Sequence, residues 1–165
     1  HLRAEEGLGY LPQQRSVFNM SVYDNILGVA QISIKGIDKQ KEITEKLLDE
    51  FNLQHLRSLN ANVLSGGELR RLMMARVMIN DPKVVLLDEP YAALDPLIIQ
   101  DISKYILSIQ AKKTSIIVSD HNVKNLFDIV DRAYVLGSQG VIAEGTPREL
   151  LKSSKAVESY FGSNF

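Results

Sequence analysis

A continuous run of four apolar residues, Val84 to Leu87, ends in two adjacent carboxylates and a proline. Such a run predicts a strand that is buried on both faces of a parallel sheet. A helical stretch from about residue 97 to residue 112 follows, and then a β-branched run at residues 115–118. Strand, helix and strand in this order predict a right-handed βαβ unit. With residues 8–11 as the end of another strand, the chain is expected to have an α/β fold.

Between the first two strands the pattern is helical. From Ser21 to about residue 51 we expect helix, with Asp38 as an N-cap and an apolar stripe formed by Ile43, Leu47 and Phe51. A further helix is predicted from Ser65 to residue 80, where Asp81 and Pro82 stop it. The sequence therefore predicts a helical segment inserted into a parallel-sheet core.

The C-terminal part predicts smaller elements. Apolar residues from Val123 to Val130 indicate an amphipathic helix, and residues 137–140 indicate the turn of a β-hairpin. Thr146, Pro147 and Glu149 form the pattern of a capping box that starts one more helix.

The carboxylates after the apolar run are the strongest chemical signal. In parallel sheets, ligands bind beyond the carboxyl ends of the strands. Asp88 would hold Mg²⁺, in part through water, and Glu89 could orient or deprotonate a water molecule for attack on a phosphate. The alternative is a strand that ends in a solvated acidic turn.

Residues 64–68 (LSGGE) carry the second signal. Ser65 and Glu68 fit a capping box, which by itself explains both residues. It does not explain Gly66 and Gly67, each of which costs about 1 kcal/mol relative to alanine. Glycines here leave backbone N–H groups open to an anion at the positive end of the helix, so phosphate binding is the alternative to plain capping.

Three weaker candidates lie in loops. His121 follows the strand at residues 115–118 and could hydrogen-bond a phosphate or the attacking water, although a lone histidine at a helix start is more often structural. Gln13 follows the first strand, and Asp95 could simply cap a helix.

Composition restricts the partners. The chain has 165 residues, 19 basic and 20 acidic side chains and a net charge of −1, so nothing indicates binding to nucleic acid. It has no cysteine, no apolar run long enough to cross a bilayer and no signal-peptide character at its N-terminus. Any role at a membrane is therefore expected to depend on a partner.

The order and spacing of these motifs resemble the ABC-transporter ATPases over the whole chain. The matching segments are the Q-loop at Gln13, the signature at residues 64–68, Walker B with its catalytic glutamate at residues 84–90, the D-loop at residues 92–95 and the switch histidine at His121. The resemblance implies a P-loop NTPase-like fold with ATP and Mg²⁺ as cofactors. It also implies a helical subdomain at residues 14–80 and a RecA-like core at residues 1–13 and 81–165.

The resemblance further implies a homodimer closed head to tail. Residues 65–68 would contact the γ-phosphate of ATP held mainly by the partner, and Asp95 would lie at the dimer seam. Glu89 would position the attacking water with support from His121, while Asp88 and Gln13 would reach Mg²⁺. Gln13 would also couple the site to an integral membrane permease, which would dock near residues 18–23.

Within the family, several segments resemble the ATPases of lipopolysaccharide export, among them residues 9–13, 21–25, 119–123 and 160–165. That function implies a cytoplasmic location on the inner face of a Gram-negative inner membrane. The branched-chain amino-acid importer ATPases share several of these segments and are the alternative. An ABC ATPase of translation or DNA repair is disfavoured by the near-neutral charge and the permease-coupling segment.

One family motif is missing from these residues. No G-x-x-x-x-G-K-[ST] sequence occurs, although this loop supplies the backbone cradle and the lysine for the β- and γ-phosphates. We therefore expect an N-terminally truncated domain that neither binds ATP tightly nor hydrolyses it, with apolar sheet surface left bare. A shortened, non-catalytic interaction module is the corresponding alternative function.

Overall fold

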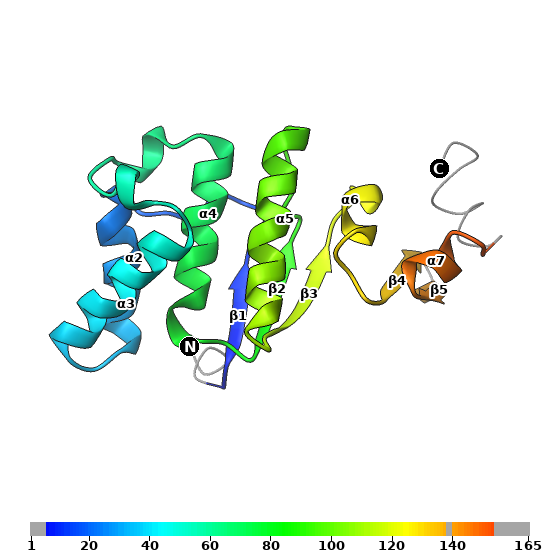
Figure 1. The fold of residues 1–165 in the computed structure, drawn as a ribbon, viewed down its shortest axis with the longest axis horizontal. Coiled ribbons are helices and arrows are strands. Elements are labelled where there is room, and N and C mark those ends of the chain that lie inside the picture. Colours follow the sequence, from blue (N-terminus) through cyan, green and yellow to red (C-terminus); the bar gives the residue numbers. More distant parts are fainter. Residues whose placement is uncertain (1–5, 138–139, 154–165) are drawn as a thin grey trace. The chain divides into compact units, whose positions relative to one another are not determined.

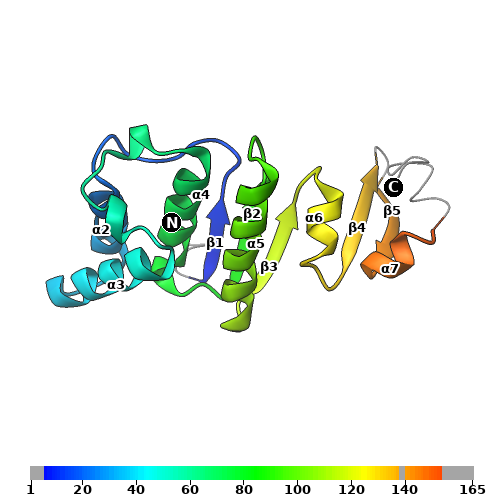
Figure 2. The same cartoon turned by 45° about the horizontal axis from the view of Figure 1, so that its top comes forward.

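The computed structural model describes residues 6–137 and 140–153 and divides into two compact units, His1–His121 and Asn122–Phe165. The helices and strands are shown in Figures 1 and 2. In the first unit they are β1 (Leu8–Leu11), α2 (Val22–Ser33), α3 (Ile37–Glu50), the 3₁₀ helices η1 (Gln54–Leu56) and η2 (Ala61–Val63), α4 (Gly66–Val77), η3 (Met78–Asn80), β2 (Val84–Asp88), α5 (Pro96–Ala111) and β3 (Ser115–Ser119). In the second they are α6 (Val123–Phe127), β4 (Ala133–Gly137), β5 (Gly140–Gly145) and α7 (Pro147–Leu150).

The first unit is built on a parallel sheet with strand order β1-β2-β3. This confirms the predicted α/β fold with a helical segment between its first two strands. The division into a helical subdomain at residues 14–80 and a core at residues 1–13 and 81–165 stays a prediction. The two compact units of the structure follow a different boundary, after His121.

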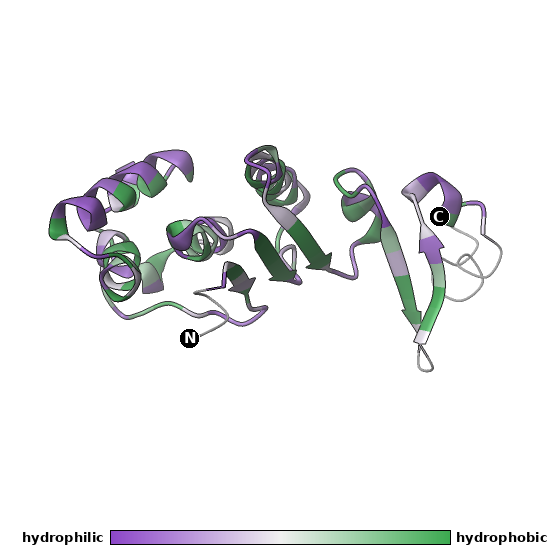
Figure 3. Ribbon diagram, turned by 90° about the horizontal axis from the view of Figure 1, so that it is seen from below, coloured by the Kyte–Doolittle hydropathy of each residue, from purple (hydrophilic) through white to green (hydrophobic). Residues whose placement is uncertain are grey.

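Helices α4 and α5 lie on the same side of this sheet (Figure 3). The side chains that point to them, such as Val85 and Leu87, are buried. On the opposite face Tyr10 is 54% exposed and Ile117 is 62% exposed, and Leu86 between them is half-buried. The prediction that β2 is buried on both faces is therefore wrong for the first unit, because none of the described helices of this unit packs on the second face. The expected bare apolar surface is confirmed.

Close packing of α4 on β1 depends on a glycine. A Cβ atom at Gly9 would lie 2.6 Å from Cγ1 of Val77, closer than side chains pack. Gly9 thus allows the helix to approach the strand.

The helical segment begins with α2, which Ser21 caps by accepting a hydrogen bond from the backbone N–H of Asp24. The N-cap of α3 is Gly36, with φ of 96°, and the prediction of Asp38 as N-cap is wrong. Asp38 lies in the first turn instead, where its charge complements the positive end of the helix. The predicted apolar stripe of α3 is confirmed, since Leu47 and Phe51 are buried and Ile43 is half-buried.

The second unit confirms the predicted hairpin and the last helix. Strands β4 and β5 pair antiparallel, and the predicted turn residues 138–139 lie outside the described residues, as do residues 160–165. Thr146 and Glu149 form the capping box of α7, with Pro147 in its first turn. Helix α6 ends at Phe127, short of the predicted Val130. Val135 and Leu150 form the buried centre of this unit.

Over residues 6–137 and 140–153, none of the helices has the length and hydropathy needed to cross a membrane.

Candidate active site

The carboxyl ends of β1, β2 and β3 lie at one edge of the parallel sheet (Figure 1). Register pairs Leu11 with Leu87 and Leu87 with Val118, so the residues that follow each strand start from the same level. This places Gln13, the two carboxylates and His121 at that edge.

Asp88 ends β2 and points to the open face of the sheet, on which Tyr10 also lies. Its Oδ2 accepts a hydrogen bond of 3.2 Å from the Tyr10 hydroxyl, and its Oδ1 accepts one of 2.9 Å from the Ser119 hydroxyl. The pKa of Tyr10 is raised by desolvation, by this hydrogen bond and by the charge of Asp88. The carboxylate is thus held in one orientation by two neutral donors.

Glu89 turns sharply away from the strand. Its φ is 46°, in the left-handed region that non-glycine residues rarely adopt and that is frequent at functional sites. Its backbone N–H donates a hydrogen bond of 2.7 Å to the carbonyl of Ser119, which fixes the turn.

Three of the predicted site residues meet at one oxygen atom. Nε2 of Gln13 donates a hydrogen bond of 2.5 Å to Oε2 of Glu89, and Nδ1 of His121 lies 3.8 Å from the same Oε2. The second distance is too long for a hydrogen bond, but it permits an ion pair when the imidazole is protonated. His121 is 69% exposed, so it is open to a substrate or to water. The structure therefore brings together groups that the sequence placed in three separate loops.

The signature residues form the capping box of α4. Oγ of Ser65 donates to Oε2 of Glu68 at 2.7 Å, and the backbone N–H of Ser65 donates to the same oxygen at 2.8 Å. These hydrogen bonds lower the pKa of Glu68. Capping accounts for Ser65 and Glu68, and their contact with phosphate stays a prediction.

The two glycines of the signature differ in their surroundings. Gly67 is buried, and a Cβ atom there would lie 2.7 Å from Cγ2 of Ile98 in α5. Close packing of α4 and α5 thus requires Gly67, a reason that the sequence analysis did not foresee. Gly66 is exposed, with Cδ2 of Leu94 at 3.1 Å from the position of its Cβ.

Asp95 is the N-cap of α5. Its Oδ1 accepts hydrogen bonds of 3.1 Å from the backbone N–H groups of Leu97 and Ile98. Helix capping is a sufficient reason for an aspartate here, and its place at a dimer seam stays a prediction.

Two buried charged residues beside the site were missed from the sequence. The side chain of Asp120 is fully buried, and its Oδ2 accepts a hydrogen bond of 3.0 Å from the backbone N–H of Tyr91. Arg70 of α4 is 7% exposed, and it donates a hydrogen bond of 3.4 Å to the carbonyl of Pro12. The spacing of Arg70 from the buried Gly67 and Met73 placed it on the inner face of the helix, which was an available signal. For Asp120 the only signal was its place next to His121.

The oxygen donors present suit a shared Mg²⁺ site. Mg²⁺ takes one or two protein oxygens and completes its shell with water and phosphate. Asp88 offers a carboxylate and Gln13 an amide oxygen, whereas the described residues contain no group of three or more acidic, histidine or cysteine side chains that could hold a metal ion. The residues at this edge therefore fit a cation that arrives with a nucleotide.

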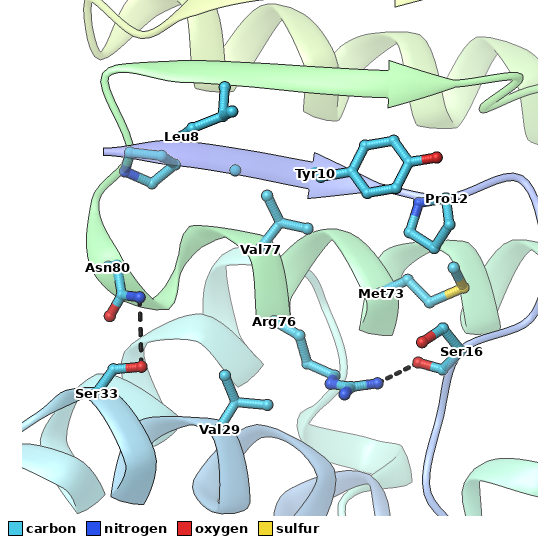
Figure 4. Close-up of a pocket in the computed structure, with 12 residues that line it drawn as sticks. Leu8, Tyr10, Pro12, Ser16, Val29, Ser33, Met73, Arg76, Val77 and Asn80 are labelled. Carbon is cyan, nitrogen blue, oxygen red and sulfur yellow. Dashed lines mark hydrogen bonds between the residues drawn. The ribbon is translucent and has the colours of Figure 1, made fainter. Parts of the chain in front are cut away.

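A separate pocket of about 250 Å³ lies between β1, α2 and α4 (Figure 4). Arg76 lines it, donates from Nη1 to the carbonyl of Ser16 and places its guanidinium 4.7 Å from the centre of the Phe18 ring. Within the described part of the chain, Nε of Arg76 is buried without a hydrogen-bond partner, and burial lowers the pKa of this side chain. Neither Asp88 nor Glu89 lines this pocket, which adjoins the loop that leads into α2.

Comparison with known proteins gives consistent similarities. The sequence model of the family described as "ABC transporter" matches residues 2–92. The lipopolysaccharide export system ATP-binding protein LptB of Haemophilus influenzae is 38% identical over 100% of this chain, which spans 69% of that relative. The protein of the same name from Escherichia coli K12 is also 38% identical, with the same coverage.

A solved structure supports the same similarity. CbiO1 of Clostridium perfringens, part of the ABC transporter complex CbiONQ, superposes with a TM-score of 0.84 at 26% identity. The superposition covers 95% of this chain and 64% of that one.

Proposed function

Because the chain belongs to the ABC transporter ATP-binding family, we propose that it forms part of an ATPase subunit that powers lipopolysaccharide export. In this proposal the sheet edge with Gln13, Glu89 and His121 is the catalytic edge, and α4 is the signature helix. The observation that supports an ATPase most directly is the convergence of Gln13 and His121 on one oxygen of Glu89. The export function is supported by 38% identity with LptB relatives over the whole chain. The importer alternative is not favoured by these relatives.

In this proposal Glu89 acts on the water that attacks the γ-phosphate. Bound Mg-ATP supplies the phosphoanhydride bond that is cleaved. The carboxylate of Glu89 accepts a proton from the water or orients it, and the hydrogen bond from Gln13 holds that carboxylate in place. His121, exposed beside it, would donate to the phosphate, and Asp88 and the amide oxygen of Gln13 would hold Mg²⁺, which would neutralise charge on the phosphates.

Two subunits would close head to tail around ATP. The exposed N-terminus of α4 would present the backbone N–H of Gly66 and the hydroxyl of Ser65 to the γ-phosphate bound by the partner subunit. Packing by Gly67 against Ile98 would hold this helix end on α5.

An integral membrane permease would dock near residues 18–23, where a loop leads into the start of α2. Phe18 and Met20 are exposed there, and Arg76 stacks on Phe18 from the neighbouring pocket. An apolar surface beside a buried cation suits a short amphipathic helix of a membrane protein. The subunit would then lie on the cytoplasmic face of the inner membrane.

The test is Glu89→Gln in the native gene product, isolated with its membrane partner. ATP turnover should fall by about 10²–10⁴-fold, because the proton acceptor is lost, while ATP binding is retained. Glu50→Gln, which removes an ion pair with Lys112 on the surface, is the matched control and should leave turnover unchanged. Turnover by the Glu89→Gln variant at the control rate would refute the role of Glu89.

The cargo is tested separately with the same complex. Lipopolysaccharide should stimulate ATP turnover, and leucine should not. The opposite result would favour the amino-acid importer.

The non-catalytic alternative is motivated by the absence of the phosphate-loop motif from these residues. An immunoblot of source cells with an antibody to this chain would decide between the ATPase and the non-catalytic interaction module. A band well above 18.5 kDa supports the ATPase, and a band at 18.5 kDa supports an interaction module.

A further inference from the structure

The loops that carry Glu89 and His121 are joined at two points beyond the end of the sheet. The ladder between β2 and β3 ends at the pair Asp88 and Ser119. Past this pair, the backbone N–H of Glu89 donates to the carbonyl of Ser119 at 2.7 Å. Two residues further on, the backbone N–H of Tyr91 donates to Oδ2 of Asp120 at 3.0 Å. The second contact is the one that a side chain supplies, so a substitution can remove it.

Asp120 is an unusual residue to bury. Its side chain is 0% exposed, and a buried carboxylate is strongly destabilising unless donors or an opposite charge compensate it. The Tyr91 N–H compensates part of this cost. Burial lowers the pKa of the Arg70 guanidinium, and the negative charge of Asp120 acts in the opposite direction, so the two charges attract each other.

Asp120 and Arg70 each lie next to a residue of the catalytic edge or to its neighbour in the chain. Nδ1 of His121 lies 3.7 Å from Oδ1 of Asp120, and Arg70 donates to the carbonyl of Pro12, immediately before Gln13. Arg70 belongs to α4, the helix that the signature starts. Asp120 therefore lies beside His121, and Arg70 contacts the residue that precedes Gln13.

We propose that Asp120 is a positioning residue for ATP hydrolysis, which holds the Glu89 loop against the His121 loop through the backbone N–H of Tyr91. The proposal rests on the function proposed above, because positioning matters only if Glu89 and His121 act on ATP. It predicts that loss of Asp120 displaces the two groups relative to each other without removing either.

The first measurement is amide hydrogen exchange at Tyr91 in the native gene product, which needs no ATP turnover. Asp120→Ala should speed exchange at Tyr91 by about tenfold, as expected when an N–H loses its acceptor. Asp101→Ala, which removes an exposed carboxylate paired with Lys104, is the control. Equal exchange rates in the two variants would overturn the proposal.

The second measurement separates positioning from stability. Asp120→Ala leaves a buried guanidinium without its opposite charge and is expected to lower the melting temperature, so its effect on turnover alone would be ambiguous. Adding Arg70→Met removes that charge and should restore the melting temperature. Because Arg70→Met also removes the hydrogen bond to the Pro12 carbonyl, the double variant is compared with Arg70→Met alone. If Asp120 positions the loops, the double variant has a kcat about 10–100-fold below that of Arg70→Met, with KM for ATP unchanged.

The two failures are distinguishable. A kcat of the double variant equal to that of Arg70→Met, together with a restored melting temperature, would show a structural role only and would overturn the proposal. Absence of ATP turnover in the native protein would refute the proposed function, and the exchange rate of Tyr91 would still decide whether Asp120 joins the two loops.

Discussion

Asn25 is the residue whose loss should most affect the loop at residues 18–21. It is fully buried at the start of α2, and its side chain donates to the carbonyls of Phe18, Met20 and Ser21 at 3.0–3.2 Å. Its Oδ1 accepts a hydrogen bond of 2.8 Å from the backbone N–H of Phe18. The side-chain amide of Asn25 thus binds the backbone of the loop at four points.

The loss of stability in Asn25→Ala can be worked out from the hydrogen bonds that each backbone group of the loop keeps. The Phe18 carbonyl keeps the N–H of Met20, the Met20 carbonyl keeps the N–H of Ala61, and the Ser21 carbonyl keeps the N–H of residue 25. The backbone N–H of Phe18 loses its acceptor, which costs about 1–3 kcal/mol. With the small cavity left by the amide, the free energy of unfolding should fall by about 2–4 kcal/mol.

Urea unfolding followed by circular dichroism measures this change. With a slope of about 2–3 kcal/mol per molar urea, the midpoint should fall by about 1 M. Asn62→Ala is the matched control, because Asn62 is exposed and its side chain makes one hydrogen bond, to Asn19; its effect should stay within about 0.5 kcal/mol. A midpoint for Asn25→Ala equal to that of Asn62→Ala would refute the reasoning. Under the proposed function, Asn25→Ala should also weaken co-purification with the permease.

Other predictions concern α4 and the nucleotide. Gly67→Ala should lower the free energy of unfolding by about 1–3 kcal/mol, because the new methyl group would meet Ile98. In urea titrations, the double variant with Ile98→Ala should lose less free energy of unfolding than the two single variants lose together. The pKa of Glu68 is lowered in the folded state, so its stabilisation is present above its ordinary value of 4.5 and is lost as the pH falls through the lowered value. Glu68→Gln should therefore be less stable than the native protein at neutral pH, and the difference in stability should shrink as the pH falls below 4.5, as thermal unfolding at a series of pH values would show. In calorimetric titration the 165-residue chain by itself should bind Mg-ATP weakly, because it lacks the phosphate loop, and tight binding would contradict this expectation.

Local signals predicted the helix ends of this protein well. The capping boxes at Ser65 and Thr146 and the N-cap at Asp95 form as expected, because each depends on residues two or three positions away. Two helix ends differ from the prediction: α6 stops at Phe127, before Val130, and Asp38 is not the N-cap of α3. A preceding glycine with positive φ starts α3 earlier, and an aspartate serves equally well in the first turn.

The sequence by itself predicted the strands, the parallel βαβ unit formed by two of them and the candidate residues of the site, because apolar runs and motif spacing can be recognised along the chain. Only the tertiary structure showed that Gln13 and His121 meet at the same oxygen of Glu89, since these contacts depend on strand register. The tertiary structure also decided which polar residues are buried. In the sequence, Asn25 looks like an ordinary helix residue and Asp120 like an ordinary loop residue. Burial makes both important, because an enclosed polar group needs partners that other segments supply.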